Sequence, residues 1–436
     1  MSLTKIFLRY YPPGIALNYQ QNNGDEYMQH IDLLDLTKNT NPDEIVRKIL
    51  AGDYNESQVV PASTSNNNNI DIISPHEDRA LKKAIAKLQR KLQEPTKKKF
   101  YIHTRSDAHI LPLTNVAFDR IGERCLTGSY DRTCRIINTQ TGCEEHVLRE
   151  HNNVVFSVAF NLPKCDRVVT GSFDGTAKIW SASSGLCRST YVGHTGEVVA
   201  AVFHPINSKT ICTASMDSTA RIFDVETTQE LQNLTYHGAE VITTHFSRDG
   251  NLLLTGSFDR TAAIWDIRSE SLIAQLRGHT AELSNCVWNF PCDLLATGSL
   301  DSTACVWDMR QLDKALYHIG DHTDEVLDVA FDSTGKRLAT ASNDCTARVW
   351  DVKGDLAMLS IMLGHTDEVS KVCFSPAGGI LMTASADATA RLWLVESGLC
   401  SQILAGHEGE VFSCTFNYSG DIILTASKDN TCRLWR

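Results

Sequence analysis

Short apolar runs separated by polar turns fill the chain from about residue 100 to its end. In one representative stretch, Val326–Phe331 mixes apolar and polar positions and Asp332–Gly335 then turns the chain. Arg337–Ser342 leads into a second, tight turn before Thr346–Trp350. Short runs bounded by Gly, Asn, Asp and Ser are typical of β-strands and are too short for most helices. The pattern therefore predicts an all-β region built from short strands.

A Ser-x-Asp-x-Thr element recurs eight times in this region, at spacings of 42 or 43 residues. Its aspartates are Asp131, Asp174, Asp217, Asp259, Asp301, Asp344, Asp387 and Asp429. A threonine stands four residues before each aspartate, and a histidine stands 22 or 23 residues before it. These histidines are His109, His151, His194, His237, His279, His322, His365 and His407. Eight matching registers identify an internal repeat.

Each repeat predicts four short strands. Gly-His precedes the strands in four of the units, and Trp-Asp follows the third strand in three of them. This arrangement is typical of one blade of a β-propeller. The region from about residue 100 to residue 436 resembles the WD-repeat family. The resemblance implies an all-β fold, an eight-bladed WD-repeat β-propeller, with a small α+β N-terminal domain in front of it.

In the family that the chain resembles, the histidine, the turn aspartate, a strand Ser or Thr and the tryptophan indole form one hydrogen-bonded chain in each blade. Two such sets are expected to be Asp301, His279, Ser299 and Trp307, and Asp344, His322, Ser342 and Trp350. Ile137 and Phe223 replace the aromatic donor in the first and third repeats. A Ser-His-Asp catalytic triad is rejected, because eight copies would mean eight active sites in one chain. We expect no enzyme activity, no cofactor and no metal site.

The last repeat stops at Trp435–Arg436, before a fourth strand could form. An open sheet edge would remain unless another segment supplied that strand. The segment 100–103 lies just before the first repeat, where the other units keep their outer strand. We therefore expect the strand 100–103 to pair with Cys432–Trp435 and to close the propeller, which would span residues 99–436.

The first 98 residues form a different module. Two strands are expected around the turn at Pro12–Gly14, a third over Tyr27–Leu34, and a helix from about Asn41 to Leu50. A polar tract at about 53–73 is predicted to be a linker. A basic amphipathic helix at about 75–93 carries an apolar stripe and is expected to dock on the acidic propeller.

Charge is distributed unevenly within the net −11 of the chain. Residues 1–104 carry a net +2 and residues 105–436 a net −13. An acidic body argues against nucleic acid as a ligand, because phosphate neutralisation needs a basic surface. No apolar run is long enough to cross a membrane, so a soluble protein of the cytosol is expected, without membrane insertion. The 14 cysteines include no C-x-x-C pair and are expected to fill the core.

Several segments are also similar to the family of WD-repeat dynein assembly factors of ciliated cells. They are Leu8–Ile15, Ile31–Leu36, Ala108–Val116 and Thr127–Cys134. The resemblance implies a cargo adaptor that links the outer-arm dynein complex to a subunit of the intraflagellar transport complex B. It further implies a location in the cytoplasm, the basal body region and the cilium or flagellum. We expect a monomer.

Three groups of residues are candidate partner-binding sites. On a propeller, the residue just before each turn aspartate lies on one face, and five consecutive repeats place a large apolar side chain there: Tyr130, Phe173, Met216, Phe258 and Leu300. Six glutamates stand three residues after the repeat histidines and could attract a basic partner: Glu197, Glu240, Glu282, Glu325, Glu368 and Glu410. The third group is Arg9, Tyr10 and Tyr11 in the N-terminal module. Packing over the turn and solvation of the acids are the alternatives for the first two groups.

A second function is also compatible with the sequence. The segments Trp265–Arg268 and Trp307–Arg310 match the W-D-x-R pattern of substrate receptors of cullin-RING ubiquitin ligases. The pattern is weak, because Arg or Lys often follows Trp-Asp in such repeats. The adaptor is the leading hypothesis and the ligase receptor the alternative.

Overall fold

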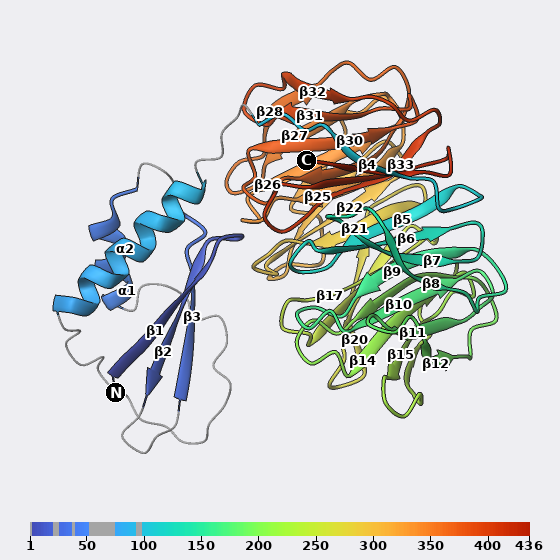
Figure 1. The fold of residues 1–436 in the computed structure, drawn as a ribbon, viewed down its shortest axis with the longest axis horizontal. Helices are drawn as coiled ribbons and strands as arrows, with labels where there is room; N and C mark the ends of the chain where they lie inside the picture. Colours follow the sequence, from blue (N-terminus) through green and yellow to red (C-terminus); the bar gives the residue numbers. More distant parts are fainter. Residues whose placement is uncertain (1, 21–25, 37–39, 52–74, 93–97) are drawn as a thin grey trace. The chain divides into compact units, whose positions relative to one another are not determined.

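The computed structural model describes residues 2–20, 26–36, 40–51, 75–92 and 98–436. The chain divides into two compact units, residues 1–96 and residues 97–436 (Figure 1). The sequence placed this boundary after residue 98, and the linker expected at 53–73 lies outside the described residues. No helix among the described residues is long and apolar enough to cross a membrane.

The N-terminal unit is a three-stranded antiparallel sheet with two helices. Its strands, in spatial order, are β1 (Ser2–Arg9), β2 (Gly14–Gln20) and β3 (Glu26–Asp32). The helices α1 (Pro42–Ala51) and α2 (Pro75–Leu92) contact each other, and α2 also contacts β1 (Figure 1). Pro42 is the first residue of α1, and the Asn41 side chain accepts a hydrogen bond from the Asp43 N–H, as an N-cap does.

The apolar stripe of α2 packs inside this unit. Leu81, Ile85 and Leu88 are fully buried in one cluster with Ile15 and Leu17 of β2. The apolar stripe is therefore covered within its own unit, and the prediction that the helix docks on the acidic propeller stays a prediction. A three-stranded sheet must bury its apolar face to be stable, and the stripe of α2 supplies that cover.

Residues 97–436 contain eight four-stranded antiparallel sheets within the described part of the chain. The first strand of each sheet, here the inner strand, is β5 (Leu113–Phe118), β9 (Val155–Phe160), β13 (Val198–Phe203), β17 (Val241–Phe246), β21 (Leu283–Trp288), β25 (Val326–Phe331), β29 (Val369–Phe374) or β33 (Val411–Phe416). The second strand is β6 (Arg124–Ser129), β10 (Arg167–Ser172), β14 (Thr210–Ser215), β18 (Leu252–Ser257), β22 (Leu294–Ser299), β26 (Arg337–Ser342), β30 (Ile380–Ser385) or β34 (Ile423–Ser427).

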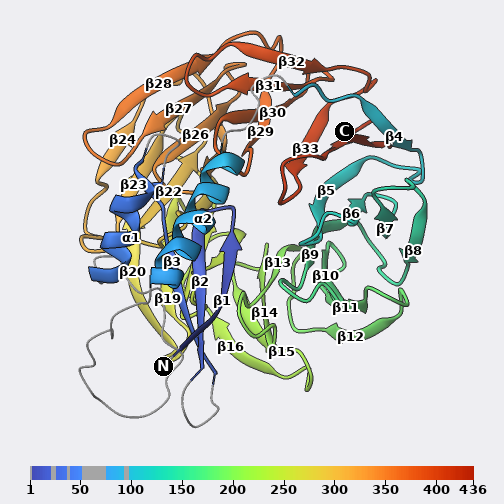
Figure 2. The ribbon, with the colours of Figure 1, turned by 60° about the vertical axis from the view of Figure 1, so that its left-hand side comes forward.

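The third strand of each sheet ends close to the Trp position of the repeat. These strands are β7 (Cys134–Asn138), β11 (Ala177–Ser181), β15 (Ala220–Asp224), β19 (Thr261–Asp266), β23 (Ala304–Asp308), β27 (Ala347–Asp351), β31 (Ala390–Leu394) and β35 (Cys432–Trp435). The fourth strand, here the outer strand, is β8 (Glu144–Leu148), β12 (Cys187–Tyr191), β16 (Glu230–Leu234), β20 (Ser271–Arg277), β24 (Tyr317–Ile319), β28 (Ala357–Met362), β32 (Cys400–Leu404) or β4 (Ile102–Ser106). Figure 2 shows β28, β32, β4, β8 and β12 following one another along the rim.

Consecutive sheets pack on one another through their inner strands, and β33 of the last sheet contacts β5 of the first. Side chains at equivalent positions of these strands also form a polar belt between neighbouring sheets. Asn285 Nδ2 donates to Asp328 Oδ1 at 2.7 Å, and the Val372 N–H donates to Asp328 Oδ2 at 3.0 Å. Between the last sheet and the first, Ser413 Oγ donates to Asn115 Oδ1 at 3.2 Å. These polar contacts connect sheets that otherwise meet through apolar side chains.

The seam between the two ends of residues 97–436 is closed by β4, which pairs antiparallel with β35. The strand begins at Ile102 rather than at residue 100, and it continues to Ser106. Just before it, Tyr101 and Arg436 exchange two backbone hydrogen bonds of 2.9 Å each. Phe100 is buried, and its ring meets the edge of the Phe416 ring at 6.4 Å between centroids. Phe100 therefore anchors the segment that completes the last sheet.

The cysteines fill the core only in part. Cys125, Cys134, Cys212, Cys286, Cys305, Cys414 and Cys432 are buried, and all 14 are free. Cys143 and Cys400 are exposed, because Cys143 lies in the turn before an outer strand and Cys400 begins one. The expectation of core filling is wrong for these two residues.

Deleting residues 1–96 is expected to leave the remaining unit folded, whereas deleting residues 1–106 should lower its melting temperature strongly. The longer deletion removes β4 and Phe100, which leaves β35 as an open edge. Phe100→Ala should act in the same direction and cost about 3 kcal/mol, because it removes a buried aromatic side chain. Thermal unfolding followed by circular dichroism would test this, and equal melting temperatures for the two deletions would contradict it.

Candidate functional site

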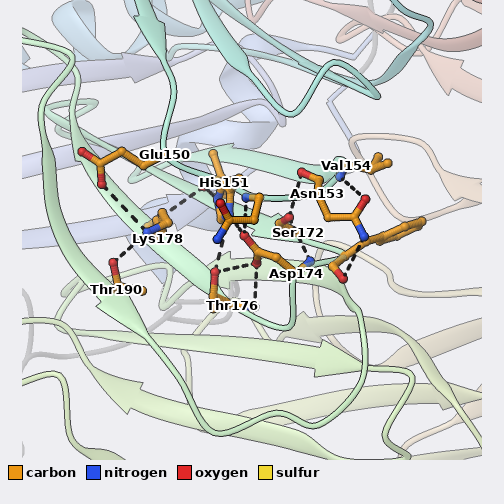
Figure 3. Close-up of polar contacts among 12 residues, drawn as sticks. Glu150, His151, Asn153, Val154, Ser172, Asp174, Thr176, Lys178 and Thr190 are labelled. Atoms are coloured by element: carbon orange, nitrogen blue, oxygen red, sulfur yellow. Dashed lines mark hydrogen bonds and ion pairs between the residues drawn. The ribbon is translucent and has the colours of Figure 1, made fainter.

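Each of the eight sheets contains one buried chain of hydrogen bonds, and Figure 3 shows its His151, Asp174 and Thr176 members in the second sheet. His151 Nδ1 lies 2.8 Å from Asp174 Oδ2, and His151 Nε2 lies 2.7 Å from Thr170 Oγ1. The Trp180 indole N–H donates to the same threonine oxygen at 2.9 Å. The Asp174 carboxylate also accepts hydrogen bonds from the hydroxyl and the N–H of Thr176. Through His151 and Thr170, the aspartate at the turn is thereby linked to the loop before β9 and to the strands β10 and β11.

The distances allow one consistent assignment of donors and acceptors along these hydrogen bonds. The carboxylate can only accept, so His151 Nδ1 carries the proton that it donates to Asp174. In a neutral ring Nε2 is then an acceptor, and it receives the Thr170 hydroxyl proton. The threonine oxygen in turn accepts from the indole of Trp180. Every polar atom of the chain has a partner, as buried polar groups require.

The same contacts recur in all eight sheets. The histidine Nδ1 to aspartate distances range from 2.7 to 3.1 Å. The histidine Nε2 to threonine distances range from 2.6 to 2.9 Å. Six tryptophans complete the chain by donating to the threonine: Trp180, Trp265, Trp307, Trp350, Trp393 and Trp435. As the sequence indicated, Ile137 and Phe223 stand in the aromatic position of the other two sheets and have no indole to donate.

The hydroxyl in this chain belongs to the threonine and not to the serine that the sequence suggested. In the fifth sheet, Thr297 accepts from Trp307, whereas Ser299 accepts from the Asp301 N–H and donates to the Ala281 carbonyl. The register explains the difference, because Trp307 pairs with Leu295 and Thr297 is the next residue on the same face. The corresponding correction holds for Ser342, whose place is taken by Thr340.

A glycine before the histidine allows this packing in three sheets. Gly193 and Gly364 have φ angles of +145° and +152°, a region that favours glycine. A Cβ atom would lie 2.7 Å from Arg221 Nη1 at the first position and 2.6 Å from Arg391 Nη1 at the second. Gly406 has the same geometry beside Arg433. The Gly-His pairs in these sheets therefore reflect a close approach of the backbone to an arginine.

Burial and hydrogen bonding set the charge states of the chain. Burial alone would raise the pKa of Asp217, but hydrogen bonds from Thr219 and His194 hold that pKa at about 2. Burial lowers the pKa of His194, and its hydrogen bond to Asp217 offsets this only in part. The pKa is lowered for the same reason in His237, His279, His322, His365 and His407. The aspartates are therefore ionised and these histidines neutral near pH 7.

The Asp-His-Thr order resembles a catalytic triad, but the atoms are already engaged. Both ring nitrogens of each histidine have partners, and the eight threonines are buried. A nucleophile must reach a substrate, and these hydroxyls do not reach the surface. Among the residues that the structure describes, no group of three His, Cys, Asp or Glu side chains could hold a metal ion. The repeated chains are structural contacts.

The first two groups of predicted binding residues lie on one surface. In every sheet the residue before the turn aspartate donates its N–H to the carbonyl of the third residue after the histidine. Phe258 thus bonds to Glu240, Leu300 to Glu282 and Met216 to Glu197, with distances of 2.9 Å. We call the surface formed by these eight residue pairs the turn face.

The turn face carries one large apolar side chain directly before the turn aspartate in each of the first five sheets. Tyr130 and Met216 are exposed, while Phe173, Phe258 and Leu300 are half-buried. Phe173 stacks on Phe156, with ring centroids 5.3 Å apart and planes at 22°. The sequence analysis missed three exposed side chains beside them: Ile110, Leu111 and Phe156. Their positions one, two and five residues after the repeat histidines could have identified them from the period.

The turn face is acidic over the last three sheets. Burial raises the pKa of Glu368, and the carboxylates of Asp367, Glu410 and Glu325 raise it further. Three consecutive sheets thus bring their carboxylates close enough to repel one another. Lys428 offsets one of them, with its Nζ 2.6 Å from Glu410. The two halves of the turn face therefore differ in chemistry.

The third group of candidates takes part in the packing of the N-terminal unit. Arg9 forms an ion pair with Asp32, and its Nε donates to the Pro12 carbonyl at 2.8 Å. Tyr11 is buried, and Tyr10 packs against the apolar cluster of this unit. The two W-D-x-R arginines, by contrast, are exposed.

Thr297→Val is expected to destabilise the protein by about 2 kcal/mol, because it leaves the Trp307 N–H and a nitrogen of His279 buried without a partner. The matched control is Thr213→Val, which leaves only His194 unpaired because Phe223 has no indole. The midpoint of urea unfolding should therefore fall further for Thr297→Val. An equal or larger effect of Thr213→Val would contradict the assigned chain.

The unfolding free energy is expected to fall as the pH is lowered from 7.5 to 5.5. The six histidines have folded pKa values below their ordinary value of 6.5, so the unfolded chain binds more protons in this range. Burial also lowers the pKa of His245 to about 4, in the same direction. Their contribution is fully present above pH 6.5 and is lost as the pH falls towards the folded values. Chemical unfolding at both pH values measures the change, and higher stability at pH 5.5 would be inconsistent with it.

Comparison with known families agrees with the repeated sheets. Residues 112–355 match the family described as the IFT122 first beta-propeller. Residues 357–393 and 398–436 match the WD domain, G-beta repeat. The first match extends over more than half of the chain.

Curated relatives with similar sequences carry the name "Dynein assembly factor with WD repeat domains 1". The protein from Danio rerio is 46% identical over 168 residues, which are 38% of this chain and 36% of the relative. The proteins from Mus musculus and Homo sapiens are each 42% identical over 168 residues, with the same coverage. The match thus spans about a third of the length of these relatives. With its repeated four-stranded sheets, the chain belongs to the WD-repeat family and carries a propeller of the IFT122 first beta-propeller type.

Proposed function

We propose that this protein is a non-enzymatic cargo adaptor that links outer-arm axonemal dynein to the intraflagellar transport complex. In this role it would bring dynein into cilia or flagella for assembly of the dynein arms. The relatives that are 42–46% identical over part of the chain are named dynein assembly factors, which supports the first half of the proposal. The partners are the outer-arm dynein complex and a subunit of the transport complex B.

An adaptor is favoured over an enzyme because the repeated polar groups bond to one another, and other side chains are left on the surface for binding. The buried histidines, aspartates and threonines are engaged with one another, whereas large apolar side chains and carboxylates remain on the turn face. Exposed aromatic side chains beside charged groups are typical of binding surfaces. We therefore assign partner binding to the turn face, with Tyr130, Phe173, Met216, Phe258 and Leu300 on its apolar part.

We further propose that the eight sheets are the blades of a closed propeller. The contact of β33 with β5, the pairing of β4 with β35 and the hydrogen bond from Ser413 to Asn115 support closure. A closed ring holds the turn face rigid, which lowers the entropic cost of binding. The protein would act as a monomer in the cytoplasm, the basal body region and the cilium.

The alternative is a substrate receptor of a cullin-RING ligase. Arg268 and Arg310 are exposed, and the N–H of each donates to the carboxylate of the preceding Trp-Asp pair, at 2.9 and 2.8 Å. These contacts hold the backbone and leave both guanidinium groups at the surface. This arrangement suits a contact with the linker protein of the ligase, but it equally suits a loop that is exposed to solvent.

Recombinant full-length protein is expected to retain subunits of outer-arm dynein and of the transport complex B from ciliated-cell extract at low salt. Phe156→Ala with Phe173→Ala should reduce retention of one partner about tenfold, because it removes a stacked pair from the turn face. Leu186→Ala is the matched control, since Leu186 is exposed outside the turn face. Quantitative mass spectrometry of the retained subunits measures the change.

Retention of neither partner would refute the adaptor, because low salt preserves acidic contacts. Retention of the ligase linker protein, lost in Arg268→Ala with Arg310→Ala, would favour the alternative instead. Unchanged retention after the double substitution at Phe156 and Phe173 would remove the turn face from the proposal.

A further inference from the structure

We propose that the outer strand β28 binds an extended, uncharged apolar segment of another protein, which adds to its sheet as a fifth strand. This inference concerns the rim and does not rest on the adaptor function or on the turn face.

Only one side of β28 is paired. Its residues Ala357–Met362 pair antiparallel with β27, and β28 is the last strand of the sheet β25-β26-β27-β28. In the described part of the chain, no further strand lies beyond it. In the second half of the strand, Ser360 donates its hydroxyl to the Val395 carbonyl of the next sheet and Gly398 lies against the Ile361 carbonyl, so the open part of the edge is Ala357–Leu359. Backbone N–H and C=O groups at an open edge can pair with another strand.

Charged residues and prolines, which protect an edge strand from unwanted pairing, are missing from β28. Most outer strands carry a charged side chain, such as Glu144 in β8, Arg188 in β12, Glu230 in β16 and Arg277 in β20. The strand β28 has the sequence AMLSIM, without charge or proline. Charges and prolines normally prevent unwanted pairing at sheet edges. Their absence from β28 therefore favours pairing there.

Large apolar side chains of β28 are also unusually exposed to solvent. Met358 and Leu359 are 44% and 39% exposed, and Leu363 directly after the strand is 69% exposed. No other outer strand in the described residues has two exposed large apolar side chains within its bounds. Leu399, which is 65% exposed, extends the patch, because the adjoining Gly398 packs against the Ile361 carbonyl.

These features determine the kind of occupant. Unpaired backbone groups require an extended backbone, since a helix has no free N–H and C=O groups to offer along its length. Apolar neighbours disfavour a charged side chain on the occupant, because burying an unpaired charge is costly. A second copy of this chain could offer only the same short edge. Stable protein interfaces bury about 1,200–2,000 Å², far more than one strand pair, so a flexible segment of another protein fits better.

A suitable probe is a synthetic peptide with the β28 sequence and its following leucine, flanked by lysines for solubility. Antiparallel pairing can place the last three residues of the peptide, Ile-Met-Leu, opposite Ala357–Leu359, so apolar residues meet apolar residues and the peptide meets the requirements for an occupant. It would be added to the full-length protein, and amide hydrogen exchange would be followed by mass spectrometry. With peptide at about ten times its dissociation constant, exchange of the β28 amides should slow about tenfold.

Met358→Lys with Leu359→Lys should weaken peptide binding at least about tenfold, and Leu363→Lys alone should weaken it less. Leu231→Lys is the matched control, since Leu231 is 49% exposed on the outer strand β16 and should not affect binding. Unchanged circular dichroism would show that the variants are folded. A peptide with aspartates at alternate positions should not bind.

Three results would overturn the proposal. They are no slowing of exchange in β28, slowing that is confined to other strands, and equal binding by the double lysine variant. Light scattering of the protein alone would identify a dimer, and a dimer that the double lysine variant abolishes would assign the edge to a second copy instead.

Discussion

The buried hydrogen bonds among aspartate, histidine and threonine hold the loop before each sheet against the turn between its second and third strands. Each member is too buried to be solvated, so the loss of one leaves the others without partners. The chain joins the loop before a sheet to the turn between its second and third strands, and it therefore fixes both ends of the turn face. Eight repetitions of the same contact produce eight turns with the same backbone geometry.

Because the turns share this backbone geometry, side chains that take no part in the buried hydrogen bonds can differ from one sheet to the next. In the first five sheets the residue before the turn aspartate is aromatic or aliphatic, and in the last three sheets neighbouring carboxylates raise the pKa of Glu368. The outer strands differ in the same way, since most carry charge and β28 carries none. In the adaptor that we propose, specificity would be a property of the variable positions, while the repeated positions would provide the rigid support.

The strands, the period and the positions of the turn aspartates could be predicted from the sequence. The reason is that the same pattern of residues recurs eight times at spacings of 42 or 43 residues. The choice between Ser299 and Thr297 could not be predicted, since it depends on which residue faces Trp307 across the paired strands. The packing of α2 was missed because an amphipathic stripe does not identify its partner; Leu81 and Ile85 meet the sheet of their own unit. Phe156 was missed because the aromatic ring with which it stacks, Phe173, belongs to a different part of the repeat.

We propose that partners bind the turn face as one rigid surface. Hydrogen exchange of the full-length protein, measured with and without purified outer-arm dynein, would test this proposal. Binding at the turn face should protect the turns around Asp131, Asp174 and Asp217, with little change at the outer strands β8, β12 and β16. Protection that is confined to the rim or to residues 2–51, with unaltered exchange at these turns, would contradict it.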